Sequence, residues 1–452
     1  LYDFQAHPDN IEWMTFDSPT SGERVNRCWQ LTKSYEELVA RRRAIEGWSR
    51  LSGGWLGRSP DHIASSMVGQ VMGLPVFEKH SKERAGALMD YFQYARDNDI
   101  YMTYVIINPQ ADRNKSVGEH DDEFLATGVV DEDAEGITVR GAKMLGTGSI
   151  MANEVLFANI QPLKPGEEKY AISFAIPMNT KGLKVMSRKS YEESATSSFD
   201  YPLSARYDEN DALVYCDDVK VPWDRVFIYK DTETARGQFQ DTYAHYMQNY
   251  QAMTRLMVKM QFQVGVARRM CETIGTIGIP SVAEKLGHMA AQAAMVEGLV
   301  YGMESGGGMF NGYYVPDRNL MYTAQVLTQQ LYPEFITSMR ELAGGGLIML
   351  PSSAEDFTDP DLNRYINATQ KSAIGTAEEK VKFMKLAWDC IGSEFASRHT
   401  QYEMFYAGAQ FVTRGHAMRT YDWERSSDLV DSILDKYSLS DTIGSGDKLA
   451  AE

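Results

Sequence analysis

Apolar residues recur at helical spacing in the first part of the chain. Ser34 and Glu37 form a capping-box pattern that opens one helix, and a second helical pattern begins at Ser81. Each pattern places its apolar side chains on one side of the helix that it predicts. We therefore expect residues 1–98 to form an N-terminal helical domain.

The hydrophobic period changes at Ile100, where short β-branched and aromatic runs separated by turn residues replace the helical pattern. Such runs are typical of strands, so we expect a central β domain over residues 99–228. The strands are expected at 100–107, 137–145, 154–160, 170–176, 183–187, 212–216 and 219–228.

Helical periods return from about residue 235. A Gly-Ile-Pro sequence stops one helix, and the next restarts at Ser281, which forms a capping pattern with Glu284. The methionines of this region are expected to pack in a core rather than to form a binding surface. The pattern predicts a C-terminal helical bundle over residues 229–452 and an α+β fold for the whole chain. Further helices are expected at 318–343, 372–396 and 421–436.

Two polar stretches are candidates for the walls of one site. Gly57–His62 places the guanidinium of Arg58 beside a turn stiffened by proline, and Tyr104–Arg113 ends an apolar run in a cluster of polar side chains. The alternative is that Arg58 pairs with a carboxylate and that the second stretch is an ordinary strand and turn.

Two further segments have the composition of a ligand site. Gly141–Ser149 is rich in small residues, so that a planar ligand could approach the backbone and the hydroxyls of Thr147 and Ser149 could bond its edge. The polar segment between Ser187 and Pro202 has little apolar surface to fix it. It is either a mobile lid over the site or a plain surface loop.

Composition excludes several classes of function. Lys plus Arg number 45 and Asp plus Glu 62, a formal net charge of −17, so no nucleic acid is expected as a partner. No apolar run is long enough for a membrane span, and the start does not read as a signal sequence, so a cytoplasmic location is expected. Because the sequence begins at Leu1 rather than Met, further N-terminal sequence is expected. The cysteines lie far apart, without metal-site spacing, so no metal is expected; they are Cys28, Cys216, Cys271 and Cys390.

Short motifs along nearly the whole chain resemble the oxygenase component of the 4-hydroxyphenylacetate 3-monooxygenase family. The matching segments are 48–51, 57–61, 108–113, 141–143, 201–204, 208–212, 221–223, 350–353 and 391–395.

The resemblance implies a fold similar to that of acyl-CoA dehydrogenases and assembly as a homotetramer. It also implies an enzyme that uses reduced FAD from a separate flavin reductase and adds one oxygen atom of O2 ortho to the hydroxyl of a phenolic substrate. Arg58, His62 and Tyr104 take the catalytic positions, in contact with the phenol. The family's flavin contacts fall on Gln110, Ala111, Asp112, Arg113, Thr147, Ser149, Phe405, Tyr406, Ala407 and Gly408.

The chain departs from the family at the positions that contact the phenol hydroxyl and at those that face its para substituent. The family's turn usually reads Arg-x-Pro-x-Tyr, with a His four residues ahead of the Asn-Pro pair, whereas this chain has His62 and Tyr104 at those positions. An imidazole and a phenol hydroxyl have thus exchanged walls. The positions that face the para substituent align approximately with Gln161 and Pro162, which weakens the expectation that 4-hydroxyphenylacetate itself is the substrate.

Three other functions stay open. A related enzyme could act on a halogenated or nitrated phenol and displace the ring substituent. A flavin-binding or scaffold protein could have lost catalysis. The third alternative is a relative of 4-hydroxybutyryl-CoA dehydratase, which resembles this family but needs an iron–sulfur cluster. It is disfavoured because no cysteine lies beside Arg58 or shortly after His288 to hold the cluster, and a cluster-free relative would lack an electron relay.

Overall fold

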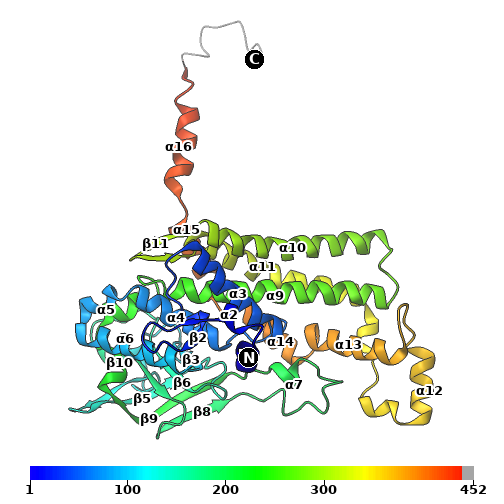
Figure 1. The fold of residues 1–452 in the computed structure, drawn as a ribbon, viewed down its shortest axis with the longest axis horizontal. Helices are drawn as coiled ribbons and strands as arrows, with labels where there is room; N and C mark the ends of the chain where they lie inside the picture. Colours follow the sequence, from blue (N-terminus) through cyan, green and yellow to red (C-terminus); the bar gives the residue numbers. More distant parts are fainter. Residues whose placement is uncertain (440–452) are drawn as a thin grey trace.

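Two four-stranded β-sheets lie to one side of the helices formed by both ends of the chain in the computed structural model, which describes residues 1–439 (Figure 1). The N-terminal part is not purely helical, because a two-stranded hairpin precedes its long helices. Its long helices are α3 (Tyr35–Leu51), α4 (Pro60–Met72) and α6 (Lys82–Asp97). Its shorter elements are α1 (Tyr2–Ala6), α2 (Ile11–Met14), β1 (Thr15–Asp17), β2 (Arg24–Asn26) and α5 (Pro75–His80).

Helix α4 corrects the expectation of a turn at Gly57–His62. Pro60 occupies the first turn of the helix, where its missing N–H costs no hydrogen bond. The helix then passes very close to the chain that enters helix α9 (Ala244–Thr273): a Cβ on Gly69 would lie 2.3 Å from the backbone of Tyr243. This close packing selects small residues, which is why the segment carries no clear helical period.

The central part consists of two four-stranded sheets that share one apolar core. The first has the order β10-β7-β6-β3 with a parallel β3–β6 pair, and the second has the order β4-β5-β9-β8 and is antiparallel. Stacked Phe157 and Phe174 lie in the core between the sheets. The strands are β3 (Met102–Val105), β4 (Gly128–Glu132), β5 (Gly136–Lys143), β6 (Glu154–Phe157), β7 (Ile172–Pro177), β8 (Leu183–Ser187), β9 (Ala212–Pro222) and β10 (Val226–Tyr229).

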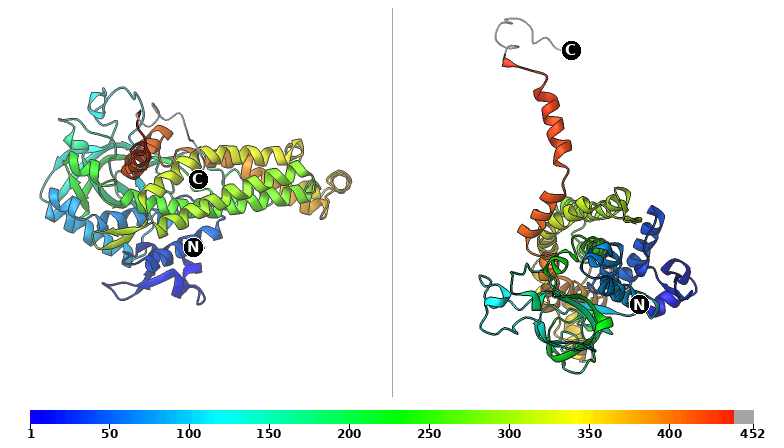
Figure 2. Two further views of the ribbon diagram at one scale, coloured as in Figure 1. Left: turned by 90° about the horizontal axis from the view of Figure 1, so that it is seen from above. Right: turned by 90° about the vertical axis from the view of Figure 1, so that its left-hand side faces the viewer.

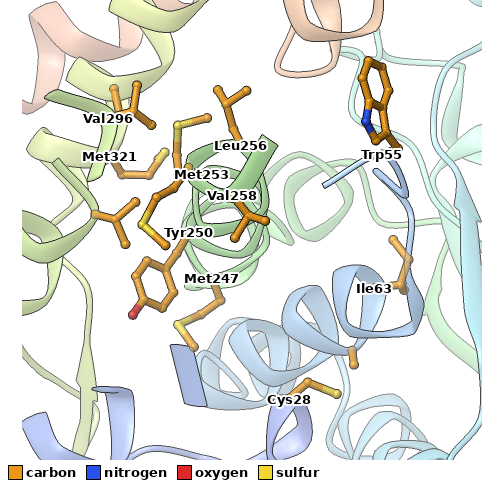
Figure 3. Packing of buried hydrophobic residues seen from close by; sticks show 14 of the residues in the cluster. Cys28, Trp55, Ile63, Met247, Tyr250, Met253, Leu256, Val258, Val296 and Met321 are labelled. Atoms are coloured by element: carbon orange, nitrogen blue, oxygen red, sulfur yellow. The ribbon is translucent and has the colours of Figure 1, made fainter. Parts of the chain in front are cut away.

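Helix α9 is the axis of the C-terminal part and packs against α4 on one side and against α10 (Pro280–Ser305) and α11 (Arg318–Ala343) on the opposite side (Figures 1 and 3). Figure 3 shows Met253 on the side toward Val296 and Met321, while Ile63 of α4 lies across the helix. The expectation that these methionines pack in the core is confirmed. The other bundle helices are α13 (Ala377–Ile391) and α14 (Glu394–Phe405).

The remaining elements connect or extend these layers. Helix α16 stands away from the rest of the molecule in Figures 1 and 2. Among the described residues, no helix has the length and apolarity that a membrane crossing requires. The elements are α7 (Ser204–Tyr207), α8 (Thr232–Gly237), β11 (Gly308–Phe310), β12 (Tyr313–Val315), α12 (Pro360–Thr369), α15 (Gln410–Thr420) and α16 (Trp423–Leu434).

The predicted fold class is confirmed, whereas several element boundaries were wrong. Helix α10 begins at Pro280, with Ile279 rather than Ser281 at its N-cap. The runs 212–216 and 219–228 become one long strand and a separate short one, and 372–396 breaks at Gly392. Strand β4 was not predicted. Whether 98/99 and 228/229 separate independent domains stays a prediction.

Candidate active site

Arg58 lies just before α4, and its guanidinium contacts two tyrosine rings. Its Nη1 donates to Tyr402 Oη at 2.6 Å, and its guanidinium carbon lies 5.1 Å from the Tyr402 ring centre and 5.6 Å from that of Tyr104. The side chain is 7% exposed. Glu209 accepts from the Arg58 backbone N–H at 2.9 Å but pairs its carboxylate with Arg398. Among the described residues no carboxylate forms an ion pair with the Arg58 guanidinium, so the alternative of an ordinary ion pair was wrong.

His62 and Tyr104 lie side by side, with ring centres 6.0 Å apart, and Gln248 of α9 joins them. Gln248 Nε2 donates to His62 Nε2 at 2.9 Å and to Tyr104 Oη at 3.0 Å. All three side chains are buried. The structure therefore brings Arg58, His62 and Tyr104 together, as the resemblance implied.

A second glutamine of α9 holds the other face of His62. His62 Nδ1–H donates to Gln251 Oε1 at 2.7 Å, and Gln251 Nε2 donates to Asp61 Oδ1 at 2.9 Å. Burial, with a contribution from nearby Arg58, holds the pKa of His62 well below its usual value, so the imidazole is neutral. Burial also raises the pKa of Asp61 to about 6.

Positive charge surrounds the Tyr402 ring. The guanidinium carbons of Arg255 and Arg398 lie 5.5 and 4.9 Å from its centre, in addition to that of Arg58. Arg255 is paired with Glu403, its two nitrogens lying 2.5 and 2.9 Å from the carboxylate oxygens. Arg398 is likewise compensated by carboxylates, whereas Arg58 is not. This arrangement leaves net positive charge at the tip of Arg58.

His399 also lies in this buried cluster. It is 1% exposed, and its Nδ1 lies 3.3 Å from Lys259 Nζ, which donates to Glu403 at 2.9 Å. His399 is therefore part of the buried cluster and does not form a surface pair with Arg398. His245 accords with a structural role, since its Nδ1 meets Tyr322 Oη at 3.1 Å in the interior.

The turn that carries Thr147 and Ser149 packs directly against the Arg58 backbone. Thr147 Oγ1 donates to Asp211 at 2.6 Å, so toward a ligand this hydroxyl acts as an acceptor. The Ser149 hydroxyl is buried and has no hydrogen-bond partner among the described residues. Gly148 has a φ of +78°, and a Cβ there would lie 3.0 Å from Tyr101 Oη. A free buried hydroxyl beside a glycine fits the polar edge of a flavin ring.

The other predicted flavin contacts are less enclosed. Gln110–Arg113 form an exposed loop after β3. Phe405 is 47% exposed, whereas Tyr406 stacks on Tyr402 at 5.4 Å and has a buried hydroxyl without a partner in the described chain. Ala407 and Gly408 follow, and the Gly408 carbonyl accepts from Gln329 at 2.7 Å. Tyr406 thus joins the Arg58 cluster, while the described contacts do not connect 110–113 to 405–408.

Gln161 and Pro162 lie on the exposed segment that follows β6. Gln161 Oε1 accepts from Asn108 Nδ2 at 2.8 Å, four residues beyond Tyr104. Buried Lys143 donates to Asn108 Oδ1 at 2.6 Å, and burial lowers its pKa to about 7. The structure therefore places Gln161 near the end of the Tyr104 strand but not in contact with Arg58 or His62.

The segment proposed as a lid is tied to the helical bundle. Arg188 pairs with Asp208 and Asp211, and Asp200 lies 3.0 Å from Lys385 of α13. Asp211 also accepts from Thr147, and Lys189 pairs with Glu394 of α14 at 2.9 Å. The described contacts do not join the segment to His62 or Tyr104. They favour the surface-loop alternative.

Two family models match the chain over almost its whole length. The model of the 4-hydroxyphenylacetate 3-hydroxylase N terminal matches residues 1–228, and that of the C terminal matches residues 235–435. The chain belongs to the 4-hydroxyphenylacetate 3-hydroxylase family. The resemblance inferred from the short motifs is thereby confirmed.

Curated relatives agree with this assignment. The 4-hydroxyphenylacetate 3-monooxygenase oxygenase component of Pseudomonas aeruginosa is 34% identical over 429 residues, which cover 93% of this chain and 81% of the relative. The 4-nitrophenol 2-monooxygenase oxygenase component of a Rhodococcus species is 32% identical and covers 93% of this chain and 80% of the relative.

Solved structures confirm the acyl-CoA dehydrogenase-like fold, and structures of this family's oxygenase component include complexes with FAD. An oxygenase component of 4-hydroxyphenylacetate 3-monooxygenase, complexed with FAD and 4-hydroxyphenylacetate, superposes with a TM-score of 0.90 at 31% identity. The superposition covers 96% of this chain and 90% of the solved chain. An archaeal 4-hydroxybutyryl-CoA dehydratase at 20% identity and a glutaryl-CoA dehydrogenase at 12% share the fold, with TM-scores of 0.86 and 0.50.

Sequence reasoning missed three residues of the site: Gln248, Gln251 and Tyr402. A signal for the glutamines was present, because polar residues recur every three or four positions along α9, on the helix that also carries the methionine stripe. Tyr402 gave a weaker signal. Its nearness to Arg58 depends on Gly57, where a Cβ would lie 2.7 Å from the Tyr402 ring.

Proposed function

We propose that this chain is the oxygenase of a two-component system that adds one atom of O2 ortho to the hydroxyl of a phenol. Reduced FAD would come from a separate flavin reductase. The observation that carries the proposal is the buried guanidinium of Arg58, which has no carboxylate partner among the described residues. A buried cation without a counter-ion is costly, so an anionic ligand is the expected partner. A phenolate supplies that charge.

Arg58 and Tyr104 are proposed to contact the oxygen of the phenol, and His62 is joined to Tyr104 through Gln248. Attraction by the guanidinium lowers the pKa of the phenol, so the phenol gives its O–H proton to solvent as it binds, and the negative charge of the phenolate spreads to the ortho carbon. That carbon is the position at which the new C–O bond forms. The apolar, buried surroundings keep water from the reacting atoms.

Thr147, Ser149 and Tyr406 are proposed to hold the flavin ring. Gln110–Arg113, together with residues 405–408, are proposed to hold the remainder of FAD. The free hydroxyls of Ser149 and Tyr406 support this assignment. When bound, reduced FAD supplies the two electrons that activate O2, of which one atom enters the ring and the other becomes water.

Gln161 and Pro162 are proposed to border the para substituent of the phenol. Gln161 is anchored through Asn108 to the strand that carries Tyr104, so its position is fixed relative to the hydroxyl cradle. An amide and a proline at this edge suit an uncharged polar substituent as well as a carboxylate. For this reason 4-nitrophenol, named in the Rhodococcus relative, belongs in the substrate panel.

The experiment mixes the purified chain with FAD, a flavin reductase, NADH and a panel of para-substituted phenols. The expected result is a catechol from at least one phenol, with little hydrogen peroxide per reduced FAD. Release of halide or nitrite in stoichiometric amount would favour the displacement alternative instead. If hydrogen peroxide, formed from O2 as reduced FAD is oxidised, were the only product with every phenol, the proposal would be contradicted.

A further inference from the structure

Four hydrogen bonds join buried side chains of α4, α9 and β3 into one hydrogen-bond chain. It runs from Asp61 through Gln251, His62 and Gln248 to Tyr104, with donor–acceptor distances of 2.9, 2.7, 2.9 and 3.0 Å. Each of the five residues is at most 8% exposed. Because no bulk water reaches these groups, each donor must face an acceptor within the chain itself.

The direction of every bond follows from the carboxylate at one end. Ionised Asp61 only accepts, so it fixes the NH2 group of Gln251 toward itself and the Gln251 carbonyl toward His62. His62 must then carry its proton on Nδ1, which leaves a lone pair on Nε2. That lone pair in turn requires an N–H of Gln248, and the same amide nitrogen donates to Tyr104 Oη.

We propose that this chain of hydrogen bonds makes Tyr104 a hydrogen-bond donor to the phenolate oxygen. His62 then acts through Gln248 as a positioning residue rather than by touching the substrate. Because Gln248 occupies a lone pair of Tyr104 Oη, the hydroxyl hydrogen points elsewhere, and the phenolate is the acceptor it meets. The inference rests on the proposed function, since it assigns the polarity of the same site.

A reversed chain would have the opposite effect. If His62 carried its proton on Nε2, Gln248 would have to turn its carbonyl toward both His62 and Tyr104. The Tyr104 hydrogen would then bond this carbonyl, and only lone pairs would face the phenolate. Asp61 and Gln251 therefore affect the substrate without contacting it.

The test uses Asp61→Asn and Gln251→Leu in the full-length chain, with 4-nitrophenol as the probe because its phenolate absorbs visible light and its phenol does not. Asp61→Asn keeps the shape but can donate as well as accept, so it removes the constraint on direction. Gln251→Leu removes the link. The matched control is Ser66→Ala, one helical turn beyond His62 on α4, whose buried hydroxyl has no partner in the described chain.

Both test variants are expected to bind 4-nitrophenolate about tenfold more weakly, as for loss of one hydrogen bond to a charged group. The apparent pKa of the bound probe should rise. A larger share of the reduced FAD consumed should yield hydrogen peroxide instead of hydroxylated product. Ser66→Ala should match the unmodified chain in all three measurements. Thermal unfolding of each variant identifies any that fails to fold, and the other variant then decides.

The inference is overturned if both variants bind and ionise the probe as the unmodified chain does while Arg58→Ala does not. A different result concerns the proposed function itself. If the unmodified chain neither binds 4-nitrophenolate nor hydroxylates any phenol of the panel, the proposed function fails, whatever the variants do.

Discussion

The two ends of the candidate site differ in how completely the single chain builds them. At the phenol end, Arg58, His62 and Tyr104 are between 1% and 8% exposed, and each has polar partners from other elements. At the cofactor end, Gln110–Arg113 are exposed, and Phe405 is 47% exposed. The chain thus prepares the phenol contacts in advance and leaves much of the cofactor surface open.

Helix packing accounts for the difference. The phenol end lies between α4 and α9, whose close approach at Gly69 fixes the side chains between them. The cofactor end is carried largely by loops, whose side chains take their positions from whatever covers them. We infer that the phenol end is preorganised and that the cofactor end takes its final form when FAD binds.

The largest effect is expected from Arg58→Ala, which removes the counter-charge of the phenolate. Hydroxylation, measured as kcat/KM for the phenol, should fall by about 2–4 kcal/mol. Oxidation of reduced FAD should continue, with peroxide as the product. Arg58→Lys keeps a charge but loses the planar fork, so it should recover only part of the loss. Equal coupling in Arg58→Ala and the unmodified chain would show that the phenol binds elsewhere.

Removal of α16 tests the expected homotetramer. This helix has twelve residues and stands away from the body, and its apolar side chains are exposed, Trp423 by 54%, Leu429 by 69% and Ile433 by 52%. A helix this short is marginal alone, so a second copy is expected to cover it. Truncation after residue 421 should lower the number of subunits per particle, measured as the particle mass in light scattering. A full-length monomer at micromolar concentration would refute the expected tetramer.

Tyr104→Phe is expected to have a smaller effect than Arg58→Ala, because it removes one hydrogen bond to the phenolate but no charge. Product per reduced FAD should fall about tenfold, with a matching rise in peroxide. His62→Ala should have a similar or smaller effect and should leave FAD oxidation intact. Unchanged coupling in both variants would sink the assignment of these side chains to the phenol.

Changes at the cofactor end should separate the two ends. Arg113→Ala and Ser149→Ala are each expected to weaken the binding of FAD by about 1 kcal/mol through a lost hydrogen bond. The binding of 4-nitrophenolate should stay unchanged. Because Gln110–Arg113 are exposed, the purified chain should also hold less than stoichiometric oxidised FAD. Isothermal titration with each ligand measures both affinities. A parallel loss of both would mean that the two ends are coupled.

The sequence was most informative where a residue pattern has one physical cause. Helix α11 was predicted with both boundaries correct, because its apolar period and the glycines that follow it agree. Helix α4 was missed, since its small residues serve contacts with α9 that no local pattern reveals. The stretches Gly57–His62 and Tyr104–Arg113 were singled out from the residue pattern, and the family resemblance then assigned the phenol to Arg58, His62 and Tyr104. Gln248 and Gln251 were not found, because their roles depend on which helix faces them.

The smallest expected effect is a pH dependence of the phenol end alone. Burial raises the pKa of Asp61 to about 6, so above that pH it is ionised and only accepts, whereas below it a protonated Asp61 can donate to Gln251 and release the direction of the chain. The other titratable groups facing Asp61 keep their state in this range. Arg41 stays charged, and burial raises the pKa values of Cys28 and Tyr101.

If the protonated form binds 4-nitrophenolate about tenfold more weakly, as proposed for Asp61→Asn, affinity for the phenolate should fall about threefold between pH 7 and pH 5.5. The affinity is calculated per phenolate present, so the titration of the free probe does not contribute. Asp61→Asn should bind weakly at both pH values and lose this dependence, while Ser66→Ala should retain it. FAD affinity should show no matching step, because the cofactor end does not contain Asp61. A threefold change that persists in Asp61→Asn would assign the titration to another group and separate Asp61 from the polarity of Tyr104.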